Sequence, residues 1–196
     1  MENREVQFWD EEKKKRYAAA IRMVIDEIYR LDVEYYKKSG HHFIRFVEHR
    51  LKSTESILSK LDRKHKGDSN QPIEELLNDI AGVRVICFDK KQIYKIVKMI
   101  KQSKIFTVLK EKDYVKNPKE NGYQSYHLIL IVDEVKVELQ LRTILMDAWS
   151  SLESIVIYKK ETPIPEKLQQ DIQKFSKWSK KMDKMFEGIL EDTIKE

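Results

Sequence analysis

Hydrophobic residues near both ends of the chain recur at helical spacing. Over Asp10–Lys38 they return every third or fourth residue, which predicts a long amphipathic helix that Gly40 ends. A similar pattern over Phe43–Lys64 predicts a second helix. The TPIP segment at 162–165 breaks the chain, and a last amphipathic pattern covers 165–195. Long helices are therefore expected at both ends.

The middle of the chain alternates between strand and helix patterns. Ala81–Phe88 and Ile105–Glu111 have the composition of strands, and Lys90–Ser103 between them has helical periodicity. Tyr126–Val132 and Val135–Arg142 form the clearest pair of strands, because a two-residue turn joins them. These patterns predict a sheet built from the central part of the chain.

The last predicted strand has two chemically different faces. Alternation puts Val and Leu on one face and four polar residues on the other, namely Lys136, Glu138, Gln140 and Arg142. Thr143 then caps a helix predicted to extend to about Lys160. The order of elements predicts one α/β (α+β) domain over 1–196, with a core at 43–160 and the helices at 10–38 and 165–195 as extensions.

Composition narrows the class of protein. The chain has 196 residues, of which 36% are charged and 41% hydrophobic, so a globular domain with a real core is expected. The net charge of +5 is mild and suits anionic small molecules at least as well as bulk nucleic acid. Cys87 lies alone in an apolar run, which predicts a buried thiol and no disulfide framework. No segment reads as a signal peptide or membrane span, so no membrane partner and a cytoplasmic location are expected.

The segment Lys112–His127 carries the densest set of candidate ligand-binding groups. It combines basic, amide, hydroxyl and aromatic side chains around an Asn-Gly turn: Lys112, Lys116, Lys119, Asn121, Tyr123 and Ser125. Such a loop lies at the surface by default, since its backbone polar groups need water or a ligand. The combination suits a base with phosphates attached, whereas an ordinary solvated hairpin loop is the alternative interpretation.

A basic stripe is predicted on the second helix. Lys52, Ser56, Lys60 and Arg63 follow spacings of four, four and three, with Arg50 off the stripe near the edge of the buried face. A stripe of this kind is usually a solvated helix face, and by itself it does not establish a binding site.

Two carboxylates are candidates for a metal site. Asp79 comes directly before the strand at Ala81–Phe88, and Glu138 points away from the core. Mg²⁺ prefers a few hard oxygen ligands and takes substrate phosphates for the rest, which two carboxylates from different strands would suit. The alternative is a pair of surface acids. Phosphate-loop and HExxH zinc patterns are absent from the sequence.

Four segments together resemble a known family. HRLKSTESILSKLDRK, NDIAGVRVICF, KDYVKNPKENGYQSYH and VELQLRTILMDAWSSLE follow the order found in RelA/SpoT-type alarmone synthetases, over about Phe43–Lys160. The chain is similar to the small alarmone synthetases, which lack hydrolase and regulatory domains. The resemblance implies a nucleotidyltransferase-like fold, a mixed β-sheet flanked by helices. It also implies Mg²⁺-dependent transfer of pyrophosphate from ATP to the ribose 3′-hydroxyl of GDP, GTP or GMP, which makes ppGpp and pppGpp in the stringent response.

The resemblance also implies a role for each matching residue. The residues that face ATP would be Arg50, Lys52, Ser56, Lys60, Arg63, Arg84, Gln140 and Arg142. The residues around the acceptor GDP or GTP would be Lys112, Lys119, Asn121, Tyr123, Ser125 and His127, with Tyr123 stacked on guanine. Asp79 and Glu138 would be the catalytic and metal-binding carboxylates, and Glu138 would orient or deprotonate the 3′-hydroxyl.

The resemblance leaves partners and acceptor open. Short members are typically homotetramers built through their helical ends, which would place Trp178 and Phe186 in an interface; an alarmone or RNA regulator would be a further partner. Ser154 and Gln124 depart from the family pattern, which leaves the acceptor preference and the rate open. One alternative is a toxic relative that pyrophosphorylates adenine nucleotides or the 3′ end of tRNA. Another is a nucleotide- or RNA-binding module with a degenerate site.

Overall fold

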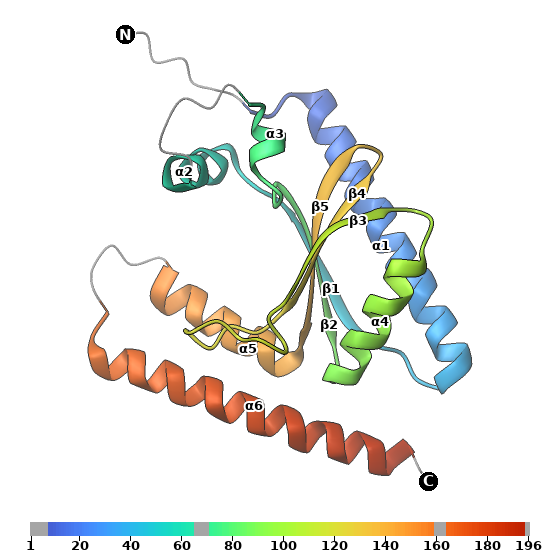
Figure 1. The fold of residues 1–196 in the computed structure, drawn as a ribbon, viewed down its shortest axis with the longest axis vertical. Coiled ribbons are helices and arrows are strands. Elements are labelled where there is room, and N and C mark those ends of the chain that lie inside the picture. Colours follow the sequence, from blue (N-terminus) through green and yellow to red (C-terminus); the bar gives the residue numbers. More distant parts are fainter. Residues whose placement is uncertain (1–7, 65–70, 159–163, 195–196) are drawn as a thin grey trace.

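A five-stranded sheet forms the centre of the molecule, with strand order β1-β2-β5-β4-β3 (Figure 1). The computed structural model describes residues 8–64, 71–158 and 164–194. Its strands are β1 (Ile44–Leu51), β2 (Ala81–Cys87), β3 (Thr107–Asp113), β4 (Tyr126–Val132) and β5 (Val135–Thr143). Its helices are α1 (Glu11–Ser39), α2 (Thr54–Lys64), α3 (Ile73–Leu76), α4 (Lys90–Gln102), α5 (Ile144–Glu153), the π-helical turn η1 (Ser154–Tyr158) and α6 (Glu166–Ile194).

The sheet is mixed and covered unequally on its two faces. β2 and β5 are parallel, whereas the other neighbouring strands are antiparallel. α1 and α4 pack on the apolar face of β2 and β5. On the other side, α2 lies near one end of the sheet and α5 with α6 near the opposite end (Figure 1). The polar face of the central strands is thereby left between them.

The β4–β5 hairpin confirms the alternation expected from the sequence. The Val and Leu residues of β5 are buried, and Glu138 and Gln140 on the other face are partly exposed. The turn consists of Asp133 and Glu134, whose φ angles of 46° and 62° are both positive. Positive φ at both turn residues matches the right-handed twist of the flanking strands. The turn therefore fixes the register that places the polar residues of β5.

The helix predicted over Phe43–Lys64 is wrong in its first half, where the structure has β1. Its apolar residues are spaced as in a helix because the strand is irregular. Ile44 pairs with Cys87 but Phe46 pairs with Ile86, so one extra residue shifts the side-chain alternation. The start of β1 is fixed by α1, since the Asp32 carboxylate accepts bonds from the amides of Phe43 and Ile44 at 2.8 and 3.2 Å. The second half of the prediction is confirmed as α2.

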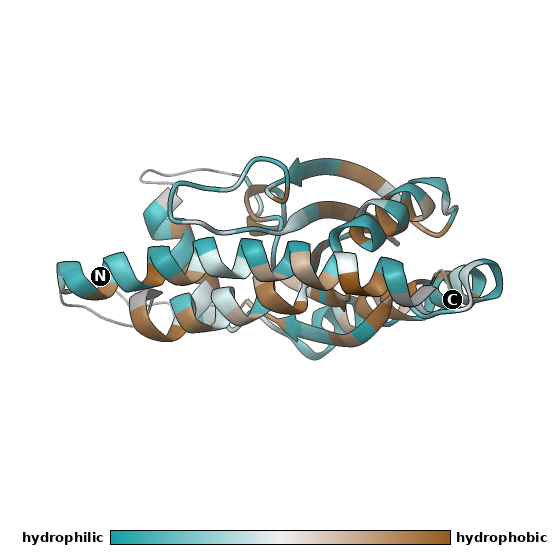
Figure 2. Ribbon diagram, turned by 90° about the horizontal axis from the view of Figure 1, so that it is seen from below, coloured by the Kyte–Doolittle hydropathy of each residue, from teal (hydrophilic) through white to brown (hydrophobic). Residues whose placement is uncertain are grey.

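The terminal helices are confirmed within a few residues of their predicted bounds. α1 begins after Asp10, which caps it through the amide of Lys13, and ends at Gly40 with φ of 78°. α6 packs along α5, and it carries large exposed hydrophobic residues: Trp178, Met182, Met185, Phe186 and Ile189. Figure 2 shows hydrophobic positions recurring along this helix. Phe175 on the same helix is half-buried.

One smaller expectation is also met. Cys87 is fully buried, and burial raises the pKa of its thiol. Within the part of the chain that the structure describes, none of the helices has the length and apolar character needed to cross a bilayer.

Candidate active site

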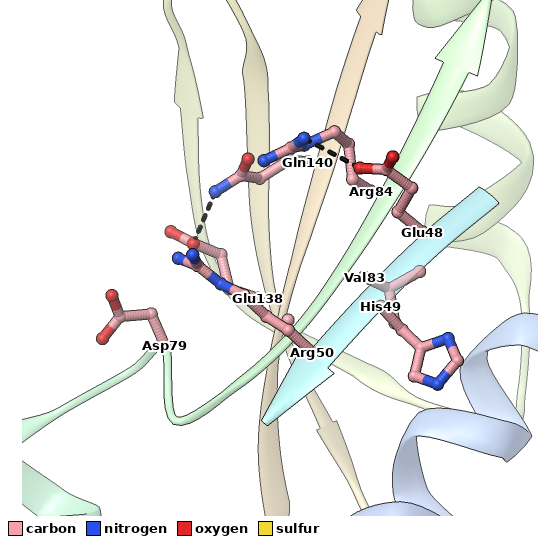
Figure 3. A pocket seen from close by; sticks show the side chains of 9 residues that line it. Glu48, His49, Arg50, Asp79, Val83, Arg84, Glu138 and Gln140 are labelled. Carbon is pink, nitrogen blue, oxygen red and sulfur yellow. Dashed lines mark hydrogen bonds and ion pairs between the residues drawn. The ribbon is translucent and has the colours of Figure 1, made fainter. Parts of the chain in front are cut away.

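A groove of about 860 Å³ opens on the polar face of the sheet, between α2, the loop before β4, and α5. Every side chain predicted to face ATP lines it: Arg50, Lys52, Ser56, Lys60, Arg63, Arg84, Gln140 and Arg142. The predicted carboxylates and most of the predicted acceptor residues line it too: Asp79, Glu138, Lys119, Asn121, Tyr123 and His127. The groove continues into a recess between β1, β2 and β5 (Figure 3). Tertiary packing thus joins residues from four separate segments into one site.

Two predicted acceptor residues lie elsewhere. Ser125 is fully buried, and its Oγ donates to the carbonyl of Leu141 at 3.3 Å, so it anchors the loop to β5 and does not face a ligand. The structure corrects the sequence prediction for this side chain. Lys112 lines a smaller neighbouring recess that it shares with Lys119 and His127. Lys116 is exposed, and its amide donates to Asp113 at 2.8 Å.

Asp79 lies before β2 and is held by two lysines from different elements. Its Oδ2 accepts from Lys52 Nζ at 2.5 Å and also pairs with Lys60 Nζ of α2. Burial opposes ionisation of Asp79, but the two ammonium groups outweigh it and hold its pKa below the usual value. Burial lowers the pKa of Lys52, which Asp79 only partly offsets. The Asp79 Oδ1 is buried without a hydrogen-bond partner in the described structure, so one oxygen remains available to a ligand.

Glu138 lies in the middle of β5 and accepts two hydrogen bonds. His127 Nδ1 is 3.1 Å from its Oε1, and Gln140 Nε2 donates to its Oε2 at 2.8 Å. His127 of β4 is the direct cross-strand partner of Gln140, so the register of the hairpin brings the three together. Burial works to raise the pKa of Glu138, but the bonds from His127 and Gln140 prevail and lower it. Glu138 is therefore an ionised acceptor inside the groove.

Tyr123 presents an aromatic ring beside Glu138. The Lys119 ammonium is 4.8 Å and the Arg142 guanidinium 5.3 Å from the ring centroid, and Trp149 meets the ring edge-on. The preceding Asn121 shapes the loop, because its Oδ1 accepts from the amide of Tyr123 at 3.1 Å. A flat ring among cations is a suitable platform for a base that carries phosphates.

Two arginines meet at a carboxylate that the sequence pattern did not single out. Arg142 Nη1 donates to Asp147 Oδ1 at 3.0 Å, and Arg84 Nη1 lies 3.3 Å from the same atom and 2.9 Å from Glu48 Oε2. Burial and the neighbouring Arg142 lower the pKa of Arg84. Figure 3 shows Arg84 beside Glu48 at one side of the recess and Asp79 with Glu138 at the other.

The groove-facing side of α5 was also missed. Ser150, Ser151 and Glu153 of α5 and Ser154 of η1 line the groove, and the side-chain amide of Asn121 donates to Glu153 Oε1 at 3.3 Å. Polar residues spaced three or four apart in a helix that directly follows β5 were the available signal. It was weak, because small polar residues on a helix usually face water.

Comparisons with known proteins agree with this geometry. The family described as "Region found in RelA / SpoT proteins" matches residues 49–163. GTP pyrophosphokinase YwaC of Bacillus subtilis (strain 168) is 38% identical over 167 residues, covering 81% of this chain and 80% of the relative. GTP pyrophosphokinase YjbM of the same organism is 32% identical, covering 92% of this chain and 90% of the relative.

Solved structures give the same answer for the fold. Small alarmone synthetase 1 from Bacillus subtilis, crystallised with its product pppGpp, superposes with a TM-score of 0.82 at 30% identity, over 93% of this chain and 98% of that one. Small alarmone synthetase 2 from the same organism gives a TM-score of 0.80 at 34% identity, over 93% of this chain and all of that one. The expected mixed sheet flanked by helices is thereby confirmed, and the chain belongs to the RelA/SpoT family.

Proposed function

We propose that this protein is a GTP pyrophosphokinase that transfers pyrophosphate from ATP to the ribose 3′-hydroxyl of GDP or GTP and so makes ppGpp or pppGpp. One observation carries the proposal: a single groove joins a cationic wall, two carboxylates and an aromatic platform, with the ionised Glu138 between the wall and the platform. The relatives named GTP pyrophosphokinase and the synthetase solved with pppGpp support the same activity.

The residues of the groove divide the chemistry between them. Glu138 is placed to accept the proton of the 3′-hydroxyl, because the group is ionised and each of its oxygens keeps a lone pair beyond the bond from His127 or Gln140. The 3′-oxygen then bonds to the β-phosphorus of ATP while the bond from that phosphorus to the α,β-bridging oxygen breaks, so that AMP leaves. Lys52, Lys60 and Arg50 supply positive charge for the phosphates along one wall.

Asp79 and Glu138 are the residues that would hold Mg²⁺. The unpartnered Oδ1 of Asp79 and the second carboxylate in the same recess fit a hard cation. Among the described residues, three or more His, Cys, Asp or Glu side chains nowhere gather into a metal-binding group, so phosphate oxygens would complete the coordination. When bound, Mg²⁺ neutralises charge that develops on the transferred phosphates. Phosphates would also give Lys52 and Lys60 a partner other than Asp79.

The acceptor side is formed by the loop before β4. Tyr123 would stack on guanine, with Lys119 and Asn121 beside it and Lys112 in the adjoining recess. We expect a homotetramer in which the exposed Trp178 and Phe186 of α6 meet another subunit.

Transfer of label from γ-labelled ATP tests the proposal. With Mg²⁺ and GMP, GDP, GTP or bulk tRNA offered separately, we expect label on a guanosine nucleotide, and none when EDTA removes the metal. Label on tRNA alone would contradict the proposal and favour a tRNA-modifying relative. Binding of ATP without transfer to any acceptor would instead favour a non-catalytic nucleotide-binding module.

Gly122→Ala is expected to distort the acceptor loop. Gly122 has φ of +92°, and an added Cβ would lie 2.3 Å from Ser176 Oγ of α6, so both backbone strain and a clash arise. We expect a loss of about 1–3 kcal/mol in the free energy of unfolding, measured by denaturant titration, together with a raised acceptor KM.

Gly188→Ala is the matched control, because this glycine of α6 has nothing within 4 Å of the added Cβ and no positive φ. It should be neutral or stabilise the helix by up to about 1 kcal/mol. Equal stability and equal acceptor KM in the two variants would contradict the role assigned to Gly122.

A further inference from the structure

Five side chains form a closed ring of hydrogen bonds around the candidate base. Arg142 Nη2 donates to the Tyr123 hydroxyl at 3.0 Å and to Gln140 Oε1 at 2.9 Å. The Tyr123 hydroxyl is 2.7 Å from His127 Nε2, and His127 Nδ1 is 3.1 Å from Glu138 Oε1. Gln140 Nε2 closes the ring by donating to Glu138 Oε2 at 2.8 Å. Two arms thus connect the buried guanidinium of Arg142 to the two oxygens of Glu138.

The chemistry of the donors gives the ring a direction. Arginine only donates, so the Tyr123 oxygen accepts from Arg142 and has its own proton left to give. If the neutral imidazole of His127 takes that bond at Nε2, its single hydrogen lies on Nδ1 and points at Glu138. In the other tautomer, Nδ1 and the carboxylate would be two acceptors facing each other at 3.1 Å. Of the two neutral tautomers, only the Nδ1–H form gives every contact of the ring one hydrogen.

The ring members cannot easily change partners. Arg142 has a side chain that is only 5% exposed, and its other amino group is bound to Asp147. Gln140 and His127 face each other across β4 and β5, so the strand register fixes their separation. Tyr123 is the one member outside the sheet, on the loop that bears the aromatic platform. Its hydroxyl is therefore the link between that loop and the base.

We propose that Tyr123 and His127 are positioning residues for Glu138: the Tyr123 hydroxyl selects the Nδ1–H tautomer of His127, which holds the carboxylate in place for the 3′-hydroxyl of the acceptor. This rests on the proposed function and gives Tyr123 a role distinct from stacking. A purine stacked on Tyr123 restrains the same side chain that orients Glu138 through His127. Acceptor binding and the alignment of Glu138 are therefore coupled. The phenol of this residue matters as well as its aromatic face.

Tyr123→Phe separates the two roles, because it keeps the aromatic face and removes only the hydroxyl. We expect acceptor KM to change by less than about threefold, since stacking persists. We expect kcat to fall by about 10- to 100-fold, since the base loses its alignment. Tyr29→Phe removes the same group from an exposed tyrosine of α1 and should behave as wild type. An unchanged kcat in Tyr123→Phe would overturn the proposal.

His127→Asn provides a rescue test. Asparagine places an amide donor near the position of Nδ1 without needing Tyr123, whereas His127→Leu offers no donor. We expect His127→Asn to keep more of the wild-type kcat than His127→Leu. Adding Tyr123→Phe to His127→Asn should cost little more, because the tyrosine acts through the histidine. Additive losses in that double variant would contradict the coupling.

The tautomer itself can be observed without turnover. ¹⁵N correlation spectra of the histidine rings, with the His127 signals identified by their loss in His127→Asn, should show the proton on Nδ1 in wild type. In Tyr123→Phe the Nε2 signal should move, because that nitrogen loses the hydroxyl that donates to it, and an unchanged spectrum would overturn the proposal. If wild type transfers no label to any acceptor but shows this shift, the proposed function fails while the ring stands. If wild type transfers label and Tyr123→Phe transfers it at the same rate, the proposed function stands and the positioning role of Tyr123 fails.

Discussion

Glu138→Gln is expected to lower kcat for pyrophosphate transfer by about 10³-fold, within the range that a positioned general base contributes. The substitution is isosteric and removes the charge that accepts from His127 and Gln140. The NH₂ group of the new amide would also face either His127 Nδ1 or Gln140 Nε2, each of which is a donor in the wild-type contact. We therefore expect a stability loss of only about 1–2 kcal/mol. Initial rates with γ-labelled ATP and saturating GDP, and thermal unfolding of the same sample, measure both quantities.

Glu134→Gln in the turn of the same hairpin is the control, because it removes an equal charge from an exposed position. It should retain wild-type rates. Full activity in Glu138→Gln would remove this residue from the role of base. If Glu138→Gln does not fold, Glu138→Asp is the variant to measure, because it keeps the charge and moves the carboxylate away from the 3′-hydroxyl of the acceptor nucleotide.

Asp79→Asn is expected to weaken metal binding and thereby to abolish most turnover. The change removes a carboxylate whose Oδ1 is buried and unpartnered in the described structure, and it leaves Lys52 and Lys60 facing each other without their shared counter-charge. Loss of a supporting carboxylate already costs metal sites 10- to 100-fold in affinity, so a loss of about 100-fold is expected for a direct ligand. Mn²⁺ binding, followed by electron paramagnetic resonance with a non-hydrolysable ATP analogue present, measures it.

Asp26→Asn on the exposed side of α1 serves as the control for Asp79→Asn. If Asp79→Asn binds Mn²⁺ and the ATP analogue as tightly as Asp26→Asn does, Asp79 is not a metal ligand. Tight metal binding combined with lost turnover would instead assign Asp79 to the alignment of Lys52 and Lys60.

Local sequence patterns determined much of the fold and the composition of the site. Strict alternation in β5 placed Glu138, Gln140 and Arg142 on one face, because successive side chains of a strand point to opposite sides whatever the strand pairs with. Helical periodicity over α1 and α4 worked equally well, since each of these helices buries one continuous apolar stripe. Periodicity also predicted α6, although most of its large hydrophobic residues are exposed. The matched segments then indicated which polar residues belong together, and nearly all of them line one groove.

The tertiary structure decided what depends on partners distant in sequence. β1 is a strand because it pairs with β2 and is fixed by Asp32 of α1, and its irregular pairing hid the alternation. Ser125 resembled a ligand-binding hydroxyl until its burial against Leu141 was known.

The electrostatics of the site were likewise decided by packing. Lys52 and Lys60 reach Asp79 from different elements, and the ring through Tyr123 and Glu138 depends on the register of β4 and β5. The sequence by itself determined which chemical groups this protein brings to its site. Their partners, protonation and alignment depended on the three-dimensional fold, because hydrogen bonds and ion pairs form only between atoms that folding places within a few ångströms.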